Sequence, residues 1–357
     1  MADTPDSNLG ILEKVSKYRP QIMGFAAMWI FIFHVRNEVL LFFHVPVLNR
    51  IEIFFDNIGF CGVDIFLFLS GWGLYHAINK HSLVSFYGRR YRRLIPPFII
   101  ACVFKALVWN WDLLRFVKAF TGWSFFTKYI HEPLWFIPAI AILYLFFPLY
   151  RRLFDKASCK YVYTAAAILL WFALAFAVSL VTKRIDGYIF VNRIPVFLIG
   201  ILFGWLTFNG KKSLGKAGAV ILVIMLLGGF QLQYYCTFRR LELLIPVSSN
   251  AFPALLIGIS VCFVSALVFH LLRNVTVIQK VFGFLGKMSL EFYVAQECLE
   301  GLLRDRILNT GVPFNKPLYA LIVLLVSLGG GYLLYILTTI ISNKLDGKPV
   351  FTAKASK

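Results

Sequence analysis

The sequence predicts an all-α integral membrane protein, a bundle of about ten transmembrane helices with both termini in the cytoplasm. Its 357 residues are 59% hydrophobic and only 15% charged, and the mean hydropathy is +0.76. A soluble domain carries about a quarter charged residues, so this much apolar surface needs lipid around it. Apolar stretches of membrane-spanning length recur along the chain, and lysine and arginine gather in alternate segments between them.

The apolar stretches fit spans of about 20 residues. We predict ten of them, at 21–42, 55–78, 94–112, 133–150, 161–181, 191–208, 217–234, 251–272, 281–303 and 318–342. Residues 1–20 are expected to form a polar cytoplasmic segment without a signal-peptide pattern, residues 21–342 one transmembrane domain, and residues 343–357 a cytoplasmic tail. We expect the aromatic-rich loop 113–132 to lie at the membrane interface or to re-enter the membrane.

The formal net charge of +19 fits the same membrane topology. With the N-terminus inside, the inner segments hold nearly twice as many lysines and arginines as the outer ones. The expected partners of this charge are anionic lipid headgroups, and a nucleic-acid partner is disfavoured because no recognised binding motif accompanies it. The six cysteines lack metal-ligand spacing, so we expect neither a metal site nor a disulfide framework.

Ionisable side chains inside spans are costly to bury and are therefore candidates for function. By the helical rise of 1.5 Å per residue, His34, Asp64, Lys105 and Glu291 are expected to share one layer near the bilayer centre. A carboxylate beside a histidine fixes its tautomer, and such an imidazole can take a proton from an attacking hydroxyl. We predict His34 as the catalytic base and Asp64 as the residue that orients it. The alternative is that these residues only make interhelical hydrogen bonds.

A basic stretch before the predicted third span is the second candidate site. Its arginines are Arg89, Arg90, Arg92 and Arg93, followed by the Pro pair at 96–97. Arginine binds phosphates bidentately, and coenzyme A carries several phosphates, so we predict a cytoplasmic acyl-CoA site here that also includes Lys105. An ordinary positive-inside anchor is the alternative. Trp135 is either an interfacial aromatic residue or a platform for a sugar ring.

Several motifs occur in an order that resembles acyltransferase family 3, the bacterial multi-spanning membrane O-acyltransferases that modify surface glycans. They lie at 32–34 (IFH), 62–71 (GVDIFLFLSG), 86–97 (FYGRRYRRLIPP), 134–138 (LWFIP), 193–200 (RIPVFLIG) and 286–293 (GKMSLEFY). The resemblance extends over residues 18–342. It implies a ten-helix core, an acyl-CoA donor and a carbohydrate acceptor, with His34 as the catalytic histidine and the arginines at 89–93 on the donor side.

The remaining candidates are positions near the acceptor or behind the catalytic groups. These are Arg19, Ser70, Trp135, Arg193, Glu291, Tyr293 and Gln296. The chain departs from the family pattern at two of its positions. Met23 stands where an arginine often precedes the histidine, with Arg19 one turn earlier as a substitute. Gln296 stands where the family often has a second histidine, and an amide cannot shuttle a proton near neutral pH.

The expected function is transfer of an acetyl group from cytoplasmic acyl-CoA to a carbohydrate hydroxyl, in the bacterial cytoplasmic membrane, with no permanently bound cofactor. The alternative is a transporter or flippase for a glycan intermediate or an acyl metabolite, because buried polar groups also suit transport. A membrane scaffold is a third reading, and it leaves the arginines and the buried histidine unexplained. The sequence leaves open the acceptor glycan, acetyl against another acyl group, the side of transfer, an acyl-enzyme intermediate and homo-oligomerisation.

Overall fold

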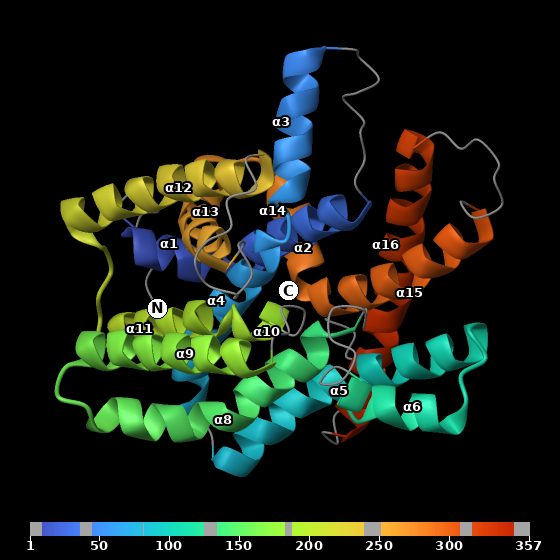
Figure 1. Ribbon diagram of the computed structural model, residues 1–357, viewed down its shortest axis with the longest axis horizontal. Helices are drawn as coiled ribbons and strands as arrows, with labels where there is room; N and C mark the ends of the chain where they lie inside the picture. Colours follow the sequence, from blue (N-terminus) through green and yellow to red (C-terminus); the bar gives the residue numbers. More distant parts are fainter. Residues whose placement is uncertain are drawn as a thin grey trace, which may run out of the picture. The chain divides into compact units, whose positions relative to one another are not determined.

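The computed structural model describes residues 9–35, 45–80, 82–124, 134–182, 188–238, 251–307 and 316–345, and these residues contain helices and turns but no strand (Figure 1). The helices are α1 (Ile11–Lys17), α2 (Arg19–Val35), α3 (Pro46–Asn57), α4 (Cys61–Ile78), α5 (Leu83–Val108), α6 (Leu113–Phe120), α8 (Phe136–Lys156), α9 (Lys160–Thr182), α10 (Tyr188–Val191), α11 (Ile194–Phe208), α12 (Gly215–Phe238), α13 (Ala251–Leu271), α14 (Thr276–Lys287), α15 (Ser289–Ile307) and α16 (Lys316–Leu345). The predicted all-α class is therefore confirmed.

Six described helices, α4, α8, α9, α12, α13 and α16, are long and apolar enough to cross a membrane. Helix α11 is apolar but shorter, at 15 residues. Helices α5 and α15 carry several charged side chains, which lowers their mean hydropathy. The structure thus supports a multi-pass membrane protein, while the count of ten spans and the cytoplasmic termini stay predictions.

The predicted span 281–303 is wrong as a single helix. The backbone leaves the helical region at Met288 (φ −102°, ψ 16°), which ends α14, and α15 begins at Ser289. The last turns of α14 are held by close backbone packing against α2, where Gly24 and Gly286 meet the opposite helix. Periodicity in the sequence did not reveal this break, because both halves continue the same apolar pattern.

The chain forms two compact units. The first comprises residues 1–81 and 146–289, and the second comprises residues 82–145 and 290–357. One boundary between them therefore falls inside α8 and another follows Ser289. Each unit is described separately.

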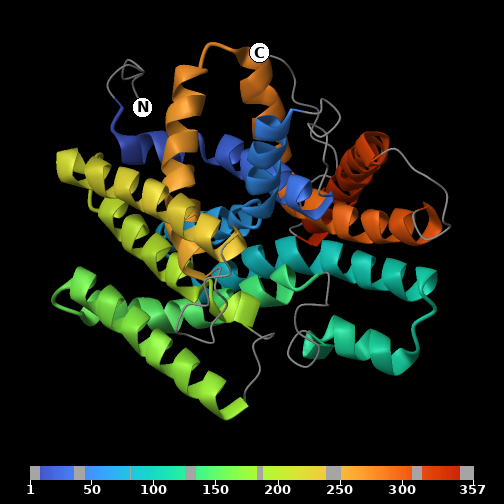
Figure 2. The same ribbon diagram turned by 45° about the horizontal axis from the view of Figure 1, so that its top comes forward.

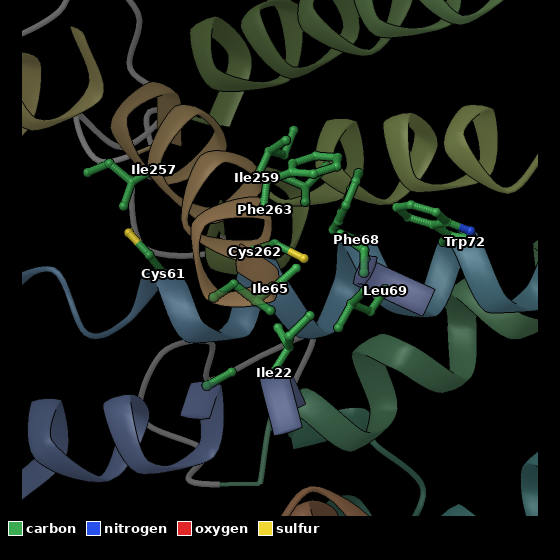
Figure 3. Close-up of a cluster of buried hydrophobic side chains, with 14 of the residues drawn as sticks. Ile22, Cys61, Ile65, Phe68, Leu69, Trp72, Ile257, Ile259, Cys262 and Phe263 are labelled. Carbon is green, nitrogen blue, oxygen red and sulfur yellow. The ribbon is translucent and has the colours of Figure 1, made fainter. Parts of the chain in front are cut away.

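In the first unit, α4 is surrounded by α2, α11 and α13. Buried side chains from these helices, among them Ile22, Phe68 and Phe263, form the core shown in Figure 3. Close helix packing requires small residues, and a Cβ on Gly200 would lie 2.2 Å from the Phe68 carbonyl oxygen. Gly200 therefore permits this close contact between α11 and α4, and Figure 1 also shows α9 beside α11.

The α2–α14 contact supports a stability prediction. A Cβ on Gly286 would lie 1.7 Å from the Pro20 carbonyl oxygen, so Gly286→Ala must push two backbones apart. We expect a loss of about 2–3 kcal/mol of unfolding free energy from this overpacking, measured by unfolding of the purified protein. Gly283→Ala on the same helix is the matched control, because its nearest contact would be an ordinary 3.5 Å to Gln21. Equal stability of the two variants would contradict the packing argument.

The short helix α1 docks on the loop before α12. The Leu12 backbone N–H donates to the Lys212 carbonyl at 3.0 Å, and Lys212 Nζ lies 3.3 Å from Glu13 Oε1. A hydrogen bond from the Gly10 backbone N–H, together with this ion pair, holds the pKa of Glu13 below its ordinary value. Figure 2 shows α1 and α2 as consecutive helices at the blue end of the chain.

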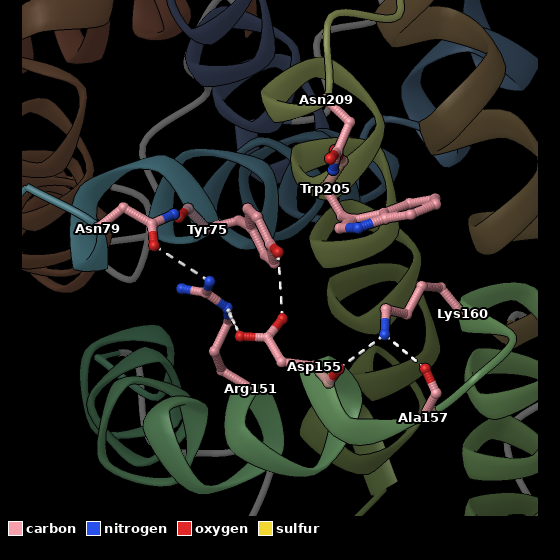
Figure 4. A network of polar contacts seen from close by, with 8 residues as sticks. All are labelled: Tyr75, Asn79, Arg151, Asp155, Ala157, Lys160, Trp205 and Asn209. Atoms are coloured by element: carbon pink, nitrogen blue, oxygen red, sulfur yellow. Dashed lines mark hydrogen bonds and ion pairs between the residues drawn. The ribbon is translucent and has the colours of Figure 1, made fainter.

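A polar network ties the end of α8 to the end of α4 in the same unit (Figure 4). Arg151 lies over the Tyr75 ring at 4.0 Å and donates to Asn79 at 3.1 Å. Asp155 pairs with Arg151 at 2.8 Å and accepts from the Tyr75 hydroxyl at 3.1 Å. Arg151 and Asp155 each have a partner within the network, so we assign the network a structural role.

In the second unit, α5 runs against the first turns of α8. The hydroxyls of Tyr87 and Tyr91 donate to the carbonyls of Leu145 and Ala141, at 2.9 and 3.0 Å, so the two helices are antiparallel. Helix α5 continues through Pro96 and Pro97, which lack backbone N–H groups. In α16, Gly331 packs closely on α15, because a Cβ there would lie 2.9 Å from the Phe292 Cα.

Candidate functional site

His34 lies in the last turn of α2, and its side chain is partly exposed. Its ring is 5.4 Å from the Phe33 ring, which in turn meets the Phe60 ring edge-on at 5.8 Å. The predicted first span extended to residue 42, and residues 36–44 lie outside the described part of the chain. The imidazole therefore stands beside an aromatic pair with part of its surface open.

Asp64 lies in the first turn of α4 with no exposed surface. Its Oδ2 is 3.5 Å from Nε of Arg193, which caps the start of α11, and the same guanidinium lies 5.8 Å from the Phe60 ring centre. On α13, Gly258 makes room for the carboxylate, because a Cβ there would lie 2.6 Å from the Asp64 Cβ. Three helices thus enclose this ion pair.

Helices α2 and α4 are antiparallel, and their register fixes the levels of His34 and Asp64. Gly62 packs on Ala26 and Ile30, while Gly59 packs on Trp29 and Phe33. Asp64 is therefore level with the middle of α2, roughly 12 Å along the axis from His34 at 1.5 Å per residue. The expectation that the two share one depth is not met, because the start of α2 at Arg19 lies level with Leu69 and not with the end of α4 at Ile78. Phe60 connects them, since its ring contacts both Phe33 and Arg193.

Arg19 stands at the opposite end of α2 from His34. It donates from Nη2 to the Leu69 carbonyl at 2.8 Å, and its guanidinium fills the space above Gly73. The 15 residues between Arg19 and His34 correspond to about 22 Å of helix. Arg19 therefore lies level with the partly exposed Ser70 and bonds the α4 backbone there, far along the helix from the catalytic candidate.

The arginine stretch lies inside α5 in the second unit. The helix begins well before the predicted span 94–112, because the Ser82 hydroxyl accepts from the Ser85 N–H and starts α5 at Leu83. Arg89 and Arg93 are both exposed, and at a spacing of four residues they share one face of the helix.

The four arginines differ in their surroundings. Arg90 lies over the rings of Phe86 and Tyr144, at 5.9 and 5.8 Å, and the Arg92 guanidinium lies against Gly88. Arg93 pairs with Glu291 at 3.5 Å, with half of its own side chain exposed. Arg90 and Arg92 are thus held by aromatic or backbone neighbours. Arg89 and Arg93 are the more exposed pair of the four.

Glu291 is 2% exposed and also accepts from the Thr338 hydroxyl at 3.2 Å. At the far end of α5, the Trp109 indole donates to Asp305 of α15 at 2.8 Å, so α5 and α15 run in the same direction. Arg93 and Lys105 are separated on α5 by about 18 Å. Glu291 is level with Arg93, so the predicted single polar layer is wrong for Glu291 and Lys105.

The other α15 candidates are packed inside the second unit. The Tyr293 ring meets Phe136 edge-on at 5.9 Å, and Gln296 is 1% exposed. Sequence reasoning missed Thr338, which gave no signal because threonine is common in apolar helices. It also missed Asp56, buried at the end of α3 beside the Trp29–Phe55 ring pair, although a carboxylate in the apolar run 53–58 was a visible signal.

Lys105 lines a small pocket between α5, the end of α6 and the start of α8. The lysine is 5% exposed, and its ammonium lies 5.8 Å from the Trp109 ring centre. Trp111, Ser124 and Trp135 also line the pocket, whose volume of about 20 Å³ holds one or two water-sized groups. A sugar ring does not fit this space, and the role of Trp135 as a platform for a sugar ring stays a prediction. Residues 125–133 of the aromatic-rich loop lie outside the described residues.

Among the described residues, no cluster of His, Cys, Asp and Glu side chains is arranged to hold a metal ion. A protein-family model described as an acyltransferase domain matches residues 23–336, nearly the whole chain. The match runs from α2 into α16 and includes every motif that pointed to the site. Comparison with curated proteins and with solved structures found no match.

Proposed function

Because this chain belongs to the acyltransferase family whose domain spans residues 23–336, we propose that it transfers an acetyl group from cytoplasmic acyl-CoA to a hydroxyl of an exported or surface carbohydrate. The observation that carries the proposal is a partly exposed histidine, His34, at the end of an otherwise apolar helix of this domain. A multi-pass protein of the bacterial cytoplasmic membrane is the setting proposed with it.

His34 acts as the general base in this proposal. The acceptor hydroxyl oxygen attacks the thioester carbonyl carbon, its proton passes to the imidazole, the carbon–sulfur bond breaks, and the departing thiolate takes the proton. Neutral imidazole suits both transfers. In the relayed variant, an imidazole nitrogen attacks the thioester carbon, the carbon–sulfur bond breaks, and the thiolate leaves as the thiol with the imidazole proton. The acceptor hydroxyl then attacks the acyl-imidazole, and its proton returns to the ring as the carbon–nitrogen bond breaks. The Phe33 and Phe60 rings hold the imidazole on an apolar flank.

The donor phosphates bind the arginines of α5. Arg89 and Arg93 are both exposed and lie on one face of the helix. This spacing suits the several phosphates of coenzyme A. Arg90 is stacked on two aromatic rings and contributes positive charge from a fixed position. Asp64 and Arg193 serve by fixing the start of α11 to α4.

A carrier for a glycan intermediate is the competing function, and it would not consume a thioester. Purified protein in lipid nanodiscs, given acetyl-CoA and a carbohydrate acceptor, is expected to release free coenzyme A thiol. The measurement is thiol release together with acetylated product by mass spectrometry. If the protein binds acetyl-CoA but releases no thiol with any acceptor tested, the carrier function would be favoured.

Arg89→Gln is expected to raise the KM for acetyl-CoA about tenfold with little change in kcat, because it removes one charge-assisted phosphate contact. The matched control is Lys344→Gln, an exposed cation near the end of α16. The effect of Arg89→Gln should shrink at high salt, since screening weakens exposed charges. An unchanged KM in both variants would remove the donor role from this face.

A further inference from the structure

The pocket beside Lys105 carries an inference about substrate specificity. It lies wholly within the second unit. Two of its polar groups only donate hydrogen bonds, the Lys105 ammonium and the Trp111 indole N–H, while the Ser124 hydroxyl donates and accepts. Among the described residues that line it there is no carboxylate. A group that only accepts hydrogen bonds would therefore match this lining better than an alcohol or an amine.

The donors are buried. Lys105 is 5% exposed and Ser124 is 2% exposed. The Trp111 indole N–H is buried without a hydrogen-bond acceptor among the described residues. A buried donor without an acceptor is unfavourable, so this N–H points to a ligand that supplies one. The Arg115 guanidinium lies over the Trp111 ring, 4.7 Å from the ring centre, and adds positive charge near the pocket.

The remaining wall is apolar. Phe98 and Cys102 come from the same face of α5 as Lys105, and Leu134 and Pro138 come from the start of α8. The volume of about 20 Å³ admits one or two oxygen-sized atoms. Such a space suits the end group of a larger molecule whose remainder lies outside the pocket.

From this donor set, size and charge, we propose that the pocket binds a carboxylate carried by one of the substrates. The proposal rests on the proposed acyl transfer and deepens it, because it assigns an acidic substrate. The carboxylate has two possible sources: the far end of a dicarboxylic acyl group on the donor, or a uronic-acid residue of the acceptor. Both present the same two oxygens to Lys105 and Trp111.

Glu297 on α15 is the neighbouring acidic group. It interacts electrostatically with Lys105 but does not line the pocket. Lys105 therefore has an acidic neighbour outside the pocket and none among the described residues that line it.

The test is isothermal titration of the purified full chain in detergent, with succinate, glucuronate and dimethyl succinate as probes. We expect the wild type to bind at least one carboxylate and not the neutral ester. Lys105→Met and Trp111→Phe should each raise its Kd about tenfold, and Lys344→Met should leave it unchanged. Trp111→Phe retains the ring, so it tests the N–H even where Lys105→Met fails to fold.

Tighter binding of succinate assigns the carboxylate to the acyl group, and tighter binding of glucuronate assigns it to the acceptor. Absence of binding by either acid, or binding that both Lys105→Met and Trp111→Phe leave intact, overturns the proposal. The same titration on His34→Ala should match the wild type. Failure of the pocket is thus distinguishable from failure of acyl transfer, which is measured separately as thiol release.

Discussion

His34→Ala is expected to lower the rate of acyl transfer by about 10²–10⁴-fold, the usual contribution of a positioned general base. The imidazole is the one side chain proposed to receive the hydroxyl proton, and alanine leaves no group that can. Its loss should leave the fold intact, because His34 is partly exposed and lies in the last turn of α2. The measurement is thiol release and acetylated glycan, normalised to protein that elutes as a single species.

The matched control for His34→Ala is His76→Gln. His76 lies on α4 in the same unit, and its Nε2 is 2.8 Å from the Thr207 hydroxyl, a hydrogen bond that glutamine can keep. We expect this variant to transfer acyl groups at the normal rate. If His34→Ala also transfers normally while folding like the wild type, the assignment of the base is wrong and the relayed mechanism fails with it.

Arg193→Met is expected to destabilise the protein by about 3–5 kcal/mol, the typical penalty for leaving one partner of a buried ion pair without the other. Asp64 has no exposed surface, and Arg193 Nε is 3.5 Å from its Oδ2. The double variant Asp64→Leu/Arg193→Met should recover most of the loss, because no isolated charge stays buried. The measurement is the free energy of unfolding of purified protein for both singles and the double.

Asp64→Asn tests the same pair from the other side. It keeps the shape of the side chain but leaves the buried Arg193 guanidinium without a counter-charge, so we expect a loss similar to that of Arg193→Met. Simple additivity of the two single losses in the double variant would show that Asp64 and Arg193 do not interact. Because neither residue touches the proposed reacting atoms, surviving molecules should keep near-normal turnover.

The helical class and the positions of most spans could be predicted because apolar stretches of membrane length are a property of local sequence. The start of α5 could not, since it depends on the hydroxyl of Ser82 capping a helix that the basic stretch seemed to interrupt. The break at Met288 was hidden for a related reason. It follows from the contact of α14 with α2, which is more than 250 residues away in the chain.

The candidate site, like the fold, could be predicted only in part from the sequence. The motifs identified His34, Asp64, the arginines and Arg193 as important positions, but not which of them pair. Asp64 pairs with Arg193, 129 positions later, because α11 packs on α4. Depth estimates from span ends failed because the ends of different helices do not lie at one level: the start of α2 at Arg19 is level with Leu69 of α4, and α15 begins only at Ser289.

The Pro pair of α5 has a mechanical consequence for the donor side. Pro96 and Pro97 cannot donate to the carbonyls of Arg92 and Arg93, so two successive rungs of the helix ladder are missing at this point. We therefore expect the turn that carries the guanidinium groups to be able to change its angle while the segment around Lys105 stays in place. The proposed phosphate site and the proposed carboxylate site would then move independently along a single helix.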